Sequence, residues 1–558
     1  MKSIKQKSGS SDFIKLCNLF LARHKLFDAE SCTLQEQTLH QLLIEDFNHE
    51  KLVIQLHNAL LFTIAYPANA GTLTLTNQLM QKLVQEVTKQ VKMNPDLYYN
   101  SGITGSVVCA RFGLLLNQYL LSKNLSLLEL SSIEGEHTDL VSQLTFTLDP
   151  VEQELMPDYA SYFKKWQKIY LGKPLLSKHE LLNYYINASM QIVGNISQKE
   201  AIFEGFELYT RFCLEPVLQG ISSARQSQGK SHFHPEGIRK KVAIETVLSQ
   251  GKPKSVFLKQ KQKEILVNIA RGTMASLLRE TDTFTFAQTH ETELFDMGEG
   301  ITIALYYMIP EQKFSLQSYV GFLLFKNGVP MAYGGCWLFA NQAAFGVNVL
   351  PPYRGGESAN VVCQLLRLYY HRFKILQFTV DPYQIGKGNE EGISSGAFWF
   401  YYKLGFRPLQ KQYSELAQTE VQKKALDKNY KTPRKILMGL ANSELYLKMT
   451  DREVSYYPLL KVSECISKYV NDNYSGNRKT ALEYSLSMYQ KLTKTRLTSD
   501  SFLNNLLLTL DTLGAFEKLP ANILKKICDA YAHKSENEAK TFLDLNKMSS
   551  YFKLFPNY

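Results

Sequence analysis

Hydrophobic residues in this chain follow a helical spacing at both ends and a strand spacing in the middle. In the N-terminal half, apolar residues recur every three or four positions, as in Leu79, Leu83, Val87 and Val91, which is typical of amphipathic helices. From about residue 282, short runs rich in β-branched and aromatic residues predict strands. After about residue 412 the helical spacing returns. The pattern therefore predicts a sheet between two mainly helical regions.

The central region contains a predicted hairpin, which is followed by alternating helices and strands. Strands are predicted at residues 283–286, 301–309, 319–325, 331–339, 344–350 and 375–380, and helices after residue 356 and at 395–404. Asn327 and Gly328 join two of these strands, and an Asn-Gly pair in that position is the strongest short hairpin signal. The order of elements predicts an α+β protein with a central mixed sheet and packed helices.

Composition and pattern together divide the chain into four parts. Residues 1–221 form a predicted N-terminal helical domain, 222–278 a basic linker and a helix, 279–412 the domain with the sheet, and 413–558 a C-terminal helical domain. The linker is predicted from its Gly, Ser and charged residues. With 45% hydrophobic and 21% charged residues, the 558-residue chain has the composition of a globular protein.

Charge and cysteine usage narrow the class of protein. The net charge of +11 favours anionic ligands and partners. The eight cysteines are scattered without a CxxC pair, which is typical of reduced thiols and argues against a zinc ribbon. The sequence has no apolar run of the roughly 18 residues that a membrane span requires. We therefore expect a cytoplasmic protein without a membrane span.

The most informative stretch, residues 345–359, reads FGVNVLPPYRGGESA. A strand ends there, a proline-rich turn follows, and two glycines lead into a helix. Free N–H groups and the helix dipole attract anions at a helix start, and glycines let the backbone approach a phosphate closely. Arg354 adds a forked, permanently charged donor. A diphosphate fits such a turn; the alternative is a tight turn that serves only the packing of the helix.

Residues 279–410 resemble the GNAT superfamily of acyl-CoA N-acyltransferases. That family carries a phosphate-binding turn after a strand, and later the phrase Ala-x-x-hydrophobic-Tyr-x-x-Leu-Gly-Phe; residues 397–408 read AFWFYYKLGFRP here. Arg354 and Ala359 match the turn, whereas Glu357 stands where the family has its central glycine. The stretch is also similar to uncharacterised bacterial proteins with GNAT-like domains. The resemblance implies an acyl-CoA acyltransferase-like sheet domain.

This resemblance also implies a site for acetyl-CoA or another acyl-CoA. The backbone of Val347, Val349 and Leu350 would pair with the pantetheine arm. The diphosphate would lie among Arg354, Gly355, Gly356, Glu357, Ser358 and Ala359. Because a carboxylate repels a diphosphate, Glu357 is expected to point away from it and to stabilise the start of its own helix. Ser394 takes the position of a frequent asparagine in the family.

Tyr401 lies where the family often has a tyrosine that protonates the departing CoA thiolate, and a phenol suits that role. An aromatic core position is the alternative for Tyr401. The family does not fix the general base. Asp381, which ends a strand, and Glu390, in the polar insertion 382–391, are the candidates, although each also fits a surface carboxylate. Three further acidic residues could take that role: Glu280, Asp282 and Glu391.

The sequence therefore predicts an acyltransferase that moves an acyl group from acyl-CoA to an amine or hydroxyl by direct attack. The alternative is a non-catalytic binding or scaffold protein with a degenerate GNAT-like domain, whose helical flanks bind protein partners. Nucleic-acid binding through the basic residues 239–263 is a third hypothesis, which no helix-turn-helix, zinc-finger or RNA-recognition signature supports. No metal site is expected, because His232 and His234 alternate on a loop without an identified third ligand.

Overall fold

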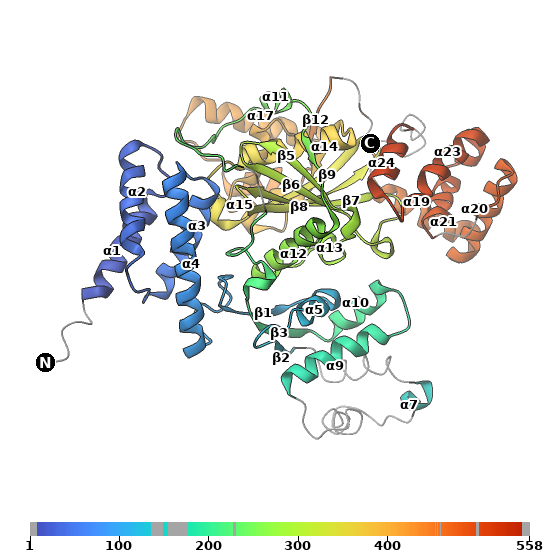
Figure 1. Ribbon diagram of the computed structural model, residues 1–558. Coiled ribbons are helices and arrows are strands. Elements are labelled where there is room, and N and C mark those ends of the chain that lie inside the picture. Colours follow the sequence, from blue (N-terminus) through green and yellow to red (C-terminus); the bar gives the residue numbers. More distant parts are fainter. Residues whose placement is uncertain are drawn as a thin grey trace.

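The computed structural model describes residues 8–134, 149–154, 177–226, 230–451, 454, 456–457, 459–497 and 501–548. Figure 1 shows a large central sheet, with the N-terminal helices at one end and the C-terminal helices at the other. A smaller group of strands and helices lies below the sheet in that view. The predicted α+β class with a mixed sheet is confirmed.

The central sheet has nine strands in the order β11-β12-β10-β9-β8-β7-β6-β5-β4. Every neighbouring pair is antiparallel except β9 and β10, which are parallel. The strands are β4 (Lys254–Val256), β5 (Glu293–Gly298), β6 (Ile301–Tyr306), β7 (Ser318–Lys326), β8 (Val329–Phe339), β9 (Gln342–Val349), β10 (Gln377–Val380), β11 (Arg407–Pro408) and β12 (Leu445–Lys448). The connection from β9 to β10 runs through a helix, because parallel strands cannot be joined by a tight turn.

The predicted hairpin joins β7 and β8. Asn327 and Gly328 have φ values of 46° and 81°, as a two-residue turn with both positions left-handed requires. The Asn327 side chain also donates to the carbonyl oxygens of Ala65 and His232, at 2.9 and 2.8 Å. The turn therefore ties the sheet to two segments that lie far away in the sequence.

The sequence predicts two of the three helices that come next to β9 and β10 in the chain, and does not predict the short helix at 390–394. The helix after β9 is α14 (Ser358–Phe373), and α15 (Glu390–Ser394) and α16 (Ala397–Lys403) come between β10 and β11. The predicted strand at 283–286 is wrong: this stretch belongs to a short helix, α13 (Asp282–Thr285). Four alternating residues are too few to distinguish a strand from one helical turn.

The N-terminal helices share one core with the central sheet. These helices are α1 (Ser8–Arg23), α2 (Ala29–Leu42), α3 (Glu50–Ala65) and α4 (Ala70–Met93). The stripe from Leu79 to Val91 lies buried on α4, as predicted. The same continuous hydrophobic core includes residues of β6, β7 and β8. The segment 222–278 also takes part in it, because it supplies α11 (Ile244–Leu248), β4 and α12 (Gln260–Ser276).

A second, three-stranded antiparallel sheet interrupts the helical N-terminal region. Its order is β1-β3-β2, formed by β1 (Val107–Arg111), β2 (Glu129–Ile133) and β3 (Leu208–Cys213). The surrounding helices are α5 (Leu114–Leu121), α7 (Pro150–Glu154), α9 (Lys178–Gln191) and α10 (Ile196–Gly205). This unit has its own hydrophobic core. The prediction of a mainly helical region over 1–221 did not include these strands, which are short and whose middle partner comes last in the sequence.

The C-terminal region supplies one strand and a group of helices. Strand β12 inserts between β10 and β11, so the sheet continues past the boundary predicted at residue 412. The helices are α17 (Lys411–Leu426), α18 (Arg434–Leu440), α19 (Leu459–Tyr474), α20 (Arg478–Thr493), α21 (Ser501–Thr512), α22 (Ala515–Lys518), α23 (Ala521–Tyr531) and α24 (Glu538–Asn546). The region after residue 412 is mainly helical but also contributes strand β12 to the central sheet.

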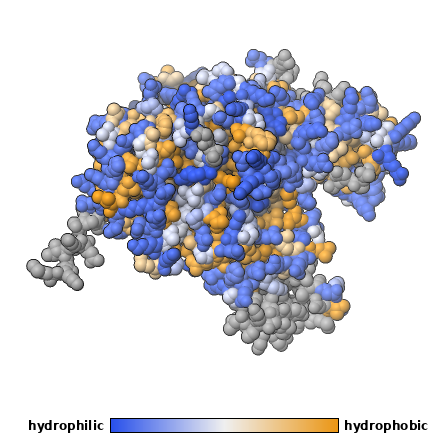
Figure 2. Space-filling view, in the orientation of Figure 1, coloured by the Kyte–Doolittle hydropathy of each residue, from blue (hydrophilic) through white to orange (hydrophobic). Residues whose placement is uncertain are grey.

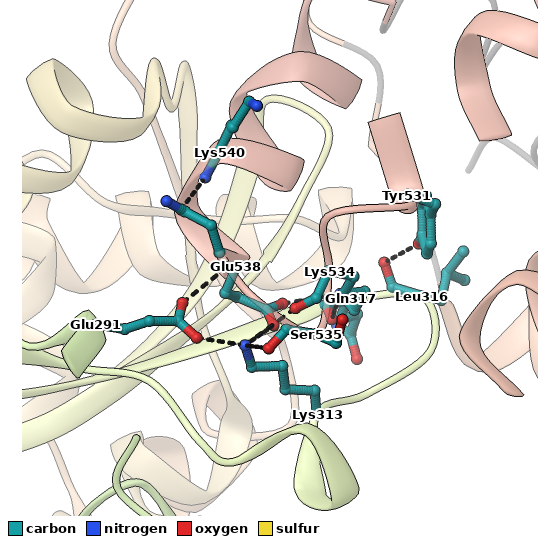
Figure 3. A network of polar contacts seen from close by, with 10 residues as sticks. Glu291, Lys313, Leu316, Gln317, Tyr531, Lys534, Ser535, Glu538 and Lys540 are labelled. Atoms are coloured by element: carbon teal, nitrogen blue, oxygen red, sulfur yellow. Dashed lines mark hydrogen bonds and ion pairs between the residues drawn. The ribbon is translucent and has the colours of Figure 1, made fainter. Parts of the chain in front are cut away.

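A buried ion network fastens the C-terminal helices to the sheet domain (Figure 3). Lys313 Nζ lies 2.5 Å from Glu291 Oε1 and 3.8 Å from Glu538 Oε2. Lys534 Nζ lies 2.8 Å from Glu538 Oε1 and donates to the Gln317 carbonyl oxygen. All four charged side chains are at most 5% exposed, so each depends on its partners for neutralisation.

The surface seen in Figure 2 mixes polar and apolar residues. The exposed large apolar side chains, such as Leu26, Val193 and Leu426, belong to separate parts of the chain. Among the described helices, none has the length and apolar character that a membrane crossing needs.

Candidate functional site

The two parallel strands of the central sheet separate at one end. Residues 377–379 of β10 pair with residues 342–344 of β9, and the pairing ends at Thr379 and Ala344. Val380 still pairs with Leu445 of β12, while β9 continues to Val349 without β10 beside it. We call the resulting space the β9–β10 cleft.

The free edge of β9 points backbone groups into this cleft. The Leu350 N–H donates to the Met331 carbonyl oxygen at 2.9 Å, on the β8 side. Because backbone groups alternate between the two edges of a strand, Val347 and Val349 direct theirs to the opposite side. The Val349 carbonyl oxygen accepts from Arg354 Nε at 3.2 Å, in agreement with this direction. The edge therefore offers amides to an extended ligand.

The β9–β10 cleft encloses a cavity of about 340 Å³. Strand β9, the following turn and three helices contribute to its wall. The lining residues are Val347, Asn348, Val349, Arg354, Gly355, Ser358, Val362, Gln384, Asn389, Glu391, Gly392, Ser395, Ala397, Phe400 and Tyr401. Five residues that the resemblance assigned to this site are not among them: Leu350, Gly356, Glu357, Ala359 and Ser394. Leu350 is buried, and Ser395 rather than Ser394 lines the cavity.

The turn before α14 presents free amides to the cavity. Gly355 adopts φ 76°, a left-handed conformation that glycine accepts at little cost. Within the described residues, the N–H groups of Gly355, Ser358 and Ala359 have no hydrogen-bond acceptor. Lys25 places a positive charge beside the turn, since its Nζ donates to the Arg354 carbonyl oxygen at 3.2 Å. Together with the dipole of α14, these groups form a site that favours an anion.

Glu357 points away from this turn. Its side chain is 1% exposed, and Oε2 lies 3.0 Å from Lys326 Nζ. Oε1 accepts from the Arg239 N–H at 3.2 Å. The Glu357 carboxylate lines neither the cavity of the β9–β10 cleft nor a second cavity at the turn, which is described below. It therefore does not contact the site that the resemblance assigned to it. Burial lowers the pKa of Lys326, and the Glu357 carboxylate opposes that shift.

Tyr401 lies on α16 and lines the cleft, although only 4% of its surface is exposed. The Phe345 and Phe406 rings hold it, with ring centroids 6.1 and 5.4 Å away. Burial raises the pKa of Tyr401 far above its ordinary value, so the phenol stays protonated near neutral pH. Tyr401 is therefore both a packed aromatic residue and a proton donor with access to the cleft.

The acidic candidates are mostly engaged elsewhere. Asp381 accepts from the Tyr383 N–H at 2.8 Å and caps the short 3₁₀ turn Pro382–Ile385. Glu390 forms an ion pair with Arg434. Neither residue lines the cleft. Glu391 does, but its Oε1 lies 2.6 Å from Arg354 Nη1.

Glu280 and Asp282 also lie outside the cleft lining. Glu280 accepts from the Gly113 N–H at 2.8 Å and from the Thr285 hydroxyl at 2.7 Å. Burial raises the pKa values of both carboxyls. Glu280 therefore joins the small sheet unit to the central one, which is a structural role.

A second cavity of about 980 Å³ adjoins the cleft and shares Gly355, Ser358, Ser395 and Phe400 with it. We call it the lysine-lined cavity. Its wall includes Gly356, Ala359 and Trp399, and three lysines: Lys240, Lys241 and Lys403. The sequence marked Lys240 and Lys241 only as part of a basic segment, because their closeness to the turn depends on the fold.

The structure also brings together His57 and Ser222, with 2.8 Å between Nε2 and Oγ. Both are buried, and the Ser222 hydroxyl also accepts from the Thr104 N–H. Because neither residue lines any of the cavities described above, this pair serves packing rather than nucleophilic catalysis. Among the described residues, no three metal-binding side chains come together, and this includes His232 and His234.

Comparisons with protein-family models, curated proteins and solved structures found no match to this chain. The fold itself defines an α+β protein whose mixed sheet opens into a cleft beside a glycine-containing turn at the start of α14. The case for a function therefore depends on the geometry of that cleft.

Proposed function

We propose that this protein is an acyltransferase that moves an acetyl or other acyl group from acyl-CoA to an amine or hydroxyl acceptor. One observation carries the proposal: the free edge of β9, the turn with unengaged amides and Tyr401 all line one cavity. These are the three features that the resemblance over residues 279–410 assigns to acyl-CoA. They come from separate elements, and packing alone does not require that they share a cavity.

The groups present suit each part of the co-substrate. The amide groups of the pantetheine arm would pair with the backbone of Val347 and Val349, as an added strand would. The diphosphate would lie at the N–H groups of Gly355, Ser358 and Ala359. Arg354 is held at the mouth of the cleft by the Val349 carbonyl oxygen and Glu391, where its remaining charge faces the same anion.

The proposed reaction is a direct attack. The acceptor nitrogen or oxygen bonds to the thioester carbonyl carbon, the C–S bond breaks, and the sulfur leaves as a thiolate. Tyr401 gives its phenolic proton to that thiolate. The phenolate regains a proton that the attacking atom loses, by way of solvent, so that in sum one proton passes from the acceptor to CoA. Burial keeps the phenol protonated near neutral pH, as this acid must be, and the same raised pKa makes it a weaker acid toward the thiolate.

One observation favours a second candidate, a protein that binds CoA without catalysis. Among the described residues of the cleft, the lining carboxylate Glu391 is paired with Arg354, and Asp381 and Glu390 lie outside. An acceptor amine that is protonated in solution would then find no unpaired base. A carboxylate at the diphosphate would be a further reason to regard the site as degenerate. Glu357 gives no such reason, because its carboxylate points into the core.

Calorimetry with acetyl-CoA tests binding, and release of CoA, followed by chromatography against a panel of amines and alcohols, tests transfer. Tyr401→Phe should lower turnover by about a hundredfold, within the range for loss of a general acid, with little change in affinity for acetyl-CoA. Tyr402→Phe is the matched control, since Tyr402 lies outside the cleft lining and packs on Arg407. Acetyl-CoA binding without transfer to any acceptor favours the second candidate, and absence of binding excludes both.

A further inference from the structure

Three lysines from two distant parts of the sequence face one cavity. Lys240 and Lys241 precede the sheet domain in the sequence, and Lys403 ends α16. The lysine-lined cavity adjoins the β9–β10 cleft, and the two share the lining residues Gly355, Ser358, Ser395 and Phe400. A ligand that lies in the cleft with its diphosphate at the turn would therefore continue toward these lysines.

The charge of this cavity is not balanced by its own wall. No acidic residue lines it, and within the described chain the three lysine side chains have no ion pair or hydrogen bond. The excess positive charge affects the pKa values of two neighbouring lysines. Burial is the main cause of the lowered pKa of Lys25, and the charge of Lys240 lowers it further. Lys403 similarly adds to the lowering of the pKa of Lys424, for which burial is the main cause. Gathered like charges repel, and a bound polyanion relieves that repulsion.

The position of Lys240 and Lys241 is fixed by the residue before them. Arg239 Nη1 lies 3.0 Å from Glu299 Oε1, and the Arg239 N–H donates to Glu357. Glu357 begins α14 and is itself held by Lys326. The buried carboxylate therefore joins the lysine segment to the turn whose amides face the cleft.

We propose that the lysine-lined cavity recognises the phosphorylated nucleotide end of CoA, and that Lys240 and Lys241 bind its terminal 3′-phosphate. Phosphate is the anion that clustered lysines hold as point charges. The half-buried ring of Phe400 in the same wall suits the adenine base, whereas Lys424 Nζ already lies over the Trp399 ring, 3.6 Å from its centroid. This inference rests on the proposed function and deepens it: the acyl donor is a free CoA thioester, rather than pantetheine attached to a carrier protein, which lacks the nucleotide.

The test compares three probes by calorimetry at low salt: acetyl-CoA, 3′-dephospho-acetyl-CoA and acetyl-pantetheine. We expect the wild-type protein to bind acetyl-CoA about tenfold more tightly than the dephospho compound, as for loss of charge-assisted hydrogen bonds at an exposed site. Added salt should shrink the difference, because exposed charges are screened. Acetyl-pantetheine should bind most weakly.

The variant Lys240→Ala/Lys241→Ala should bind acetyl-CoA as weakly as wild type binds the dephospho compound, and should bind the dephospho compound unchanged. Lys525→Ala/Lys526→Ala is the matched control, because it removes two exposed neighbouring lysines from α23 in the C-terminal helices. Equal wild-type affinities for acetyl-CoA and the dephospho compound overturn this inference and leave the proposed function standing. If none of the three probes binds, the proposed function fails together with it. The wild-type comparison needs no variant, so it decides even if the double variant does not fold.

Discussion

Glu357→Gln would remove the negative charge that neutralises Lys326 in the core beneath the turn before α14. The two side chains are 1% and 0% exposed, with 3.0 Å between Oε2 and Nζ. At that separation and an effective dielectric constant of about 20, the attraction is roughly 5 kcal/mol. Removal of one partner from a buried pair typically costs about 3–5 kcal/mol, because the other charge stays buried. We expect a loss of that size in the free energy of unfolding.

The loss should depend on pH in a direction that identifies its cause. Burial already lowers the pKa of Lys326, and loss of the carboxylate lowers it further. A lysine whose pKa is lower in the folded state contributes stability at high pH and loses it as the pH falls through the folded-state pKa. The deficit of Glu357→Gln relative to wild type should therefore be larger at pH 7 than at pH 10.

Urea denaturation of both proteins at the two pH values measures these deficits. The double variant Lys326→Met/Glu357→Gln should recover much of the lost free energy of unfolding, because it removes both buried charges. Glu415→Gln is the control, since its ion pair with Lys411 is exposed and should matter by less than about 1 kcal/mol. The reasoning is refuted if Glu357→Gln costs no more than this control, or if its deficit does not change with pH. Because the carboxylate points away from the free amides, the folded variant should still bind acetyl-CoA.

Three further predictions concern residues that connect different segments of the fold. Lys313→Met leaves two glutamates of the C-terminal network without their shared cation, and should cost about 3–5 kcal/mol and speed proteolysis of the C-terminal helices, unlike Lys468→Met at an exposed pair. Burial raises the pKa of Glu200 to about 7, so the stability that its protonated form contributes is lost as the pH rises from about 4.5 through 7. The melting temperature of wild type, measured relative to that of Glu200→Gln, should therefore fall between pH 5 and pH 8. A difference that stays the same across this range contradicts the prediction. Gly328→Ala places a Cβ at φ 81° only 2.6 Å from a backbone oxygen and should destabilise by more than about 1 kcal/mol in urea, whereas Gly439→Ala, with open space in α18, should be neutral or stabilising.

Local signals in the sequence predicted the elements whose partners are neighbours in the chain. The Asn327-Gly328 pair fixed the β7–β8 hairpin, and the apolar stripe from Leu79 to Val91 fixed the buried face of α4. Strands β1, β2 and β3 escaped detection because the middle strand, β3, follows β2 only after a long excursion through helices. Strand β12 escaped for the same reason, since it is four residues long and is separated from its partner β10 in the sequence by helices α15 to α18. Pairing between distant segments leaves little trace in the pattern of either one.

The candidate site divides in the same way. Tyr401, Arg354 and Gly355 carry recognisable local spacing, and they line one cavity in the structure. The cations that pair with the acidic residues could not be predicted from the sequence. Lys326, the partner of Glu357, and Arg434, the partner of Glu390, lie on other elements of the fold. A carboxylate in a sequence motif shows its chemistry only when the cation beside it is known.

The β9–β10 cleft owes its existence to the residues that end β10. Pro382 has no N–H and cannot continue a ladder beside β9. Asp381 accepts from the Tyr383 N–H and turns the chain into the 3₁₀ turn that follows. That turn brings Gln384 over β9, so that a Cβ at Gly346 would lie 3.4 Å from its Nε2. Asp381 therefore shapes the cleft through the backbone: by ending β10 early, it leaves the N–H groups of Val347 and Val349 without that strand beside them.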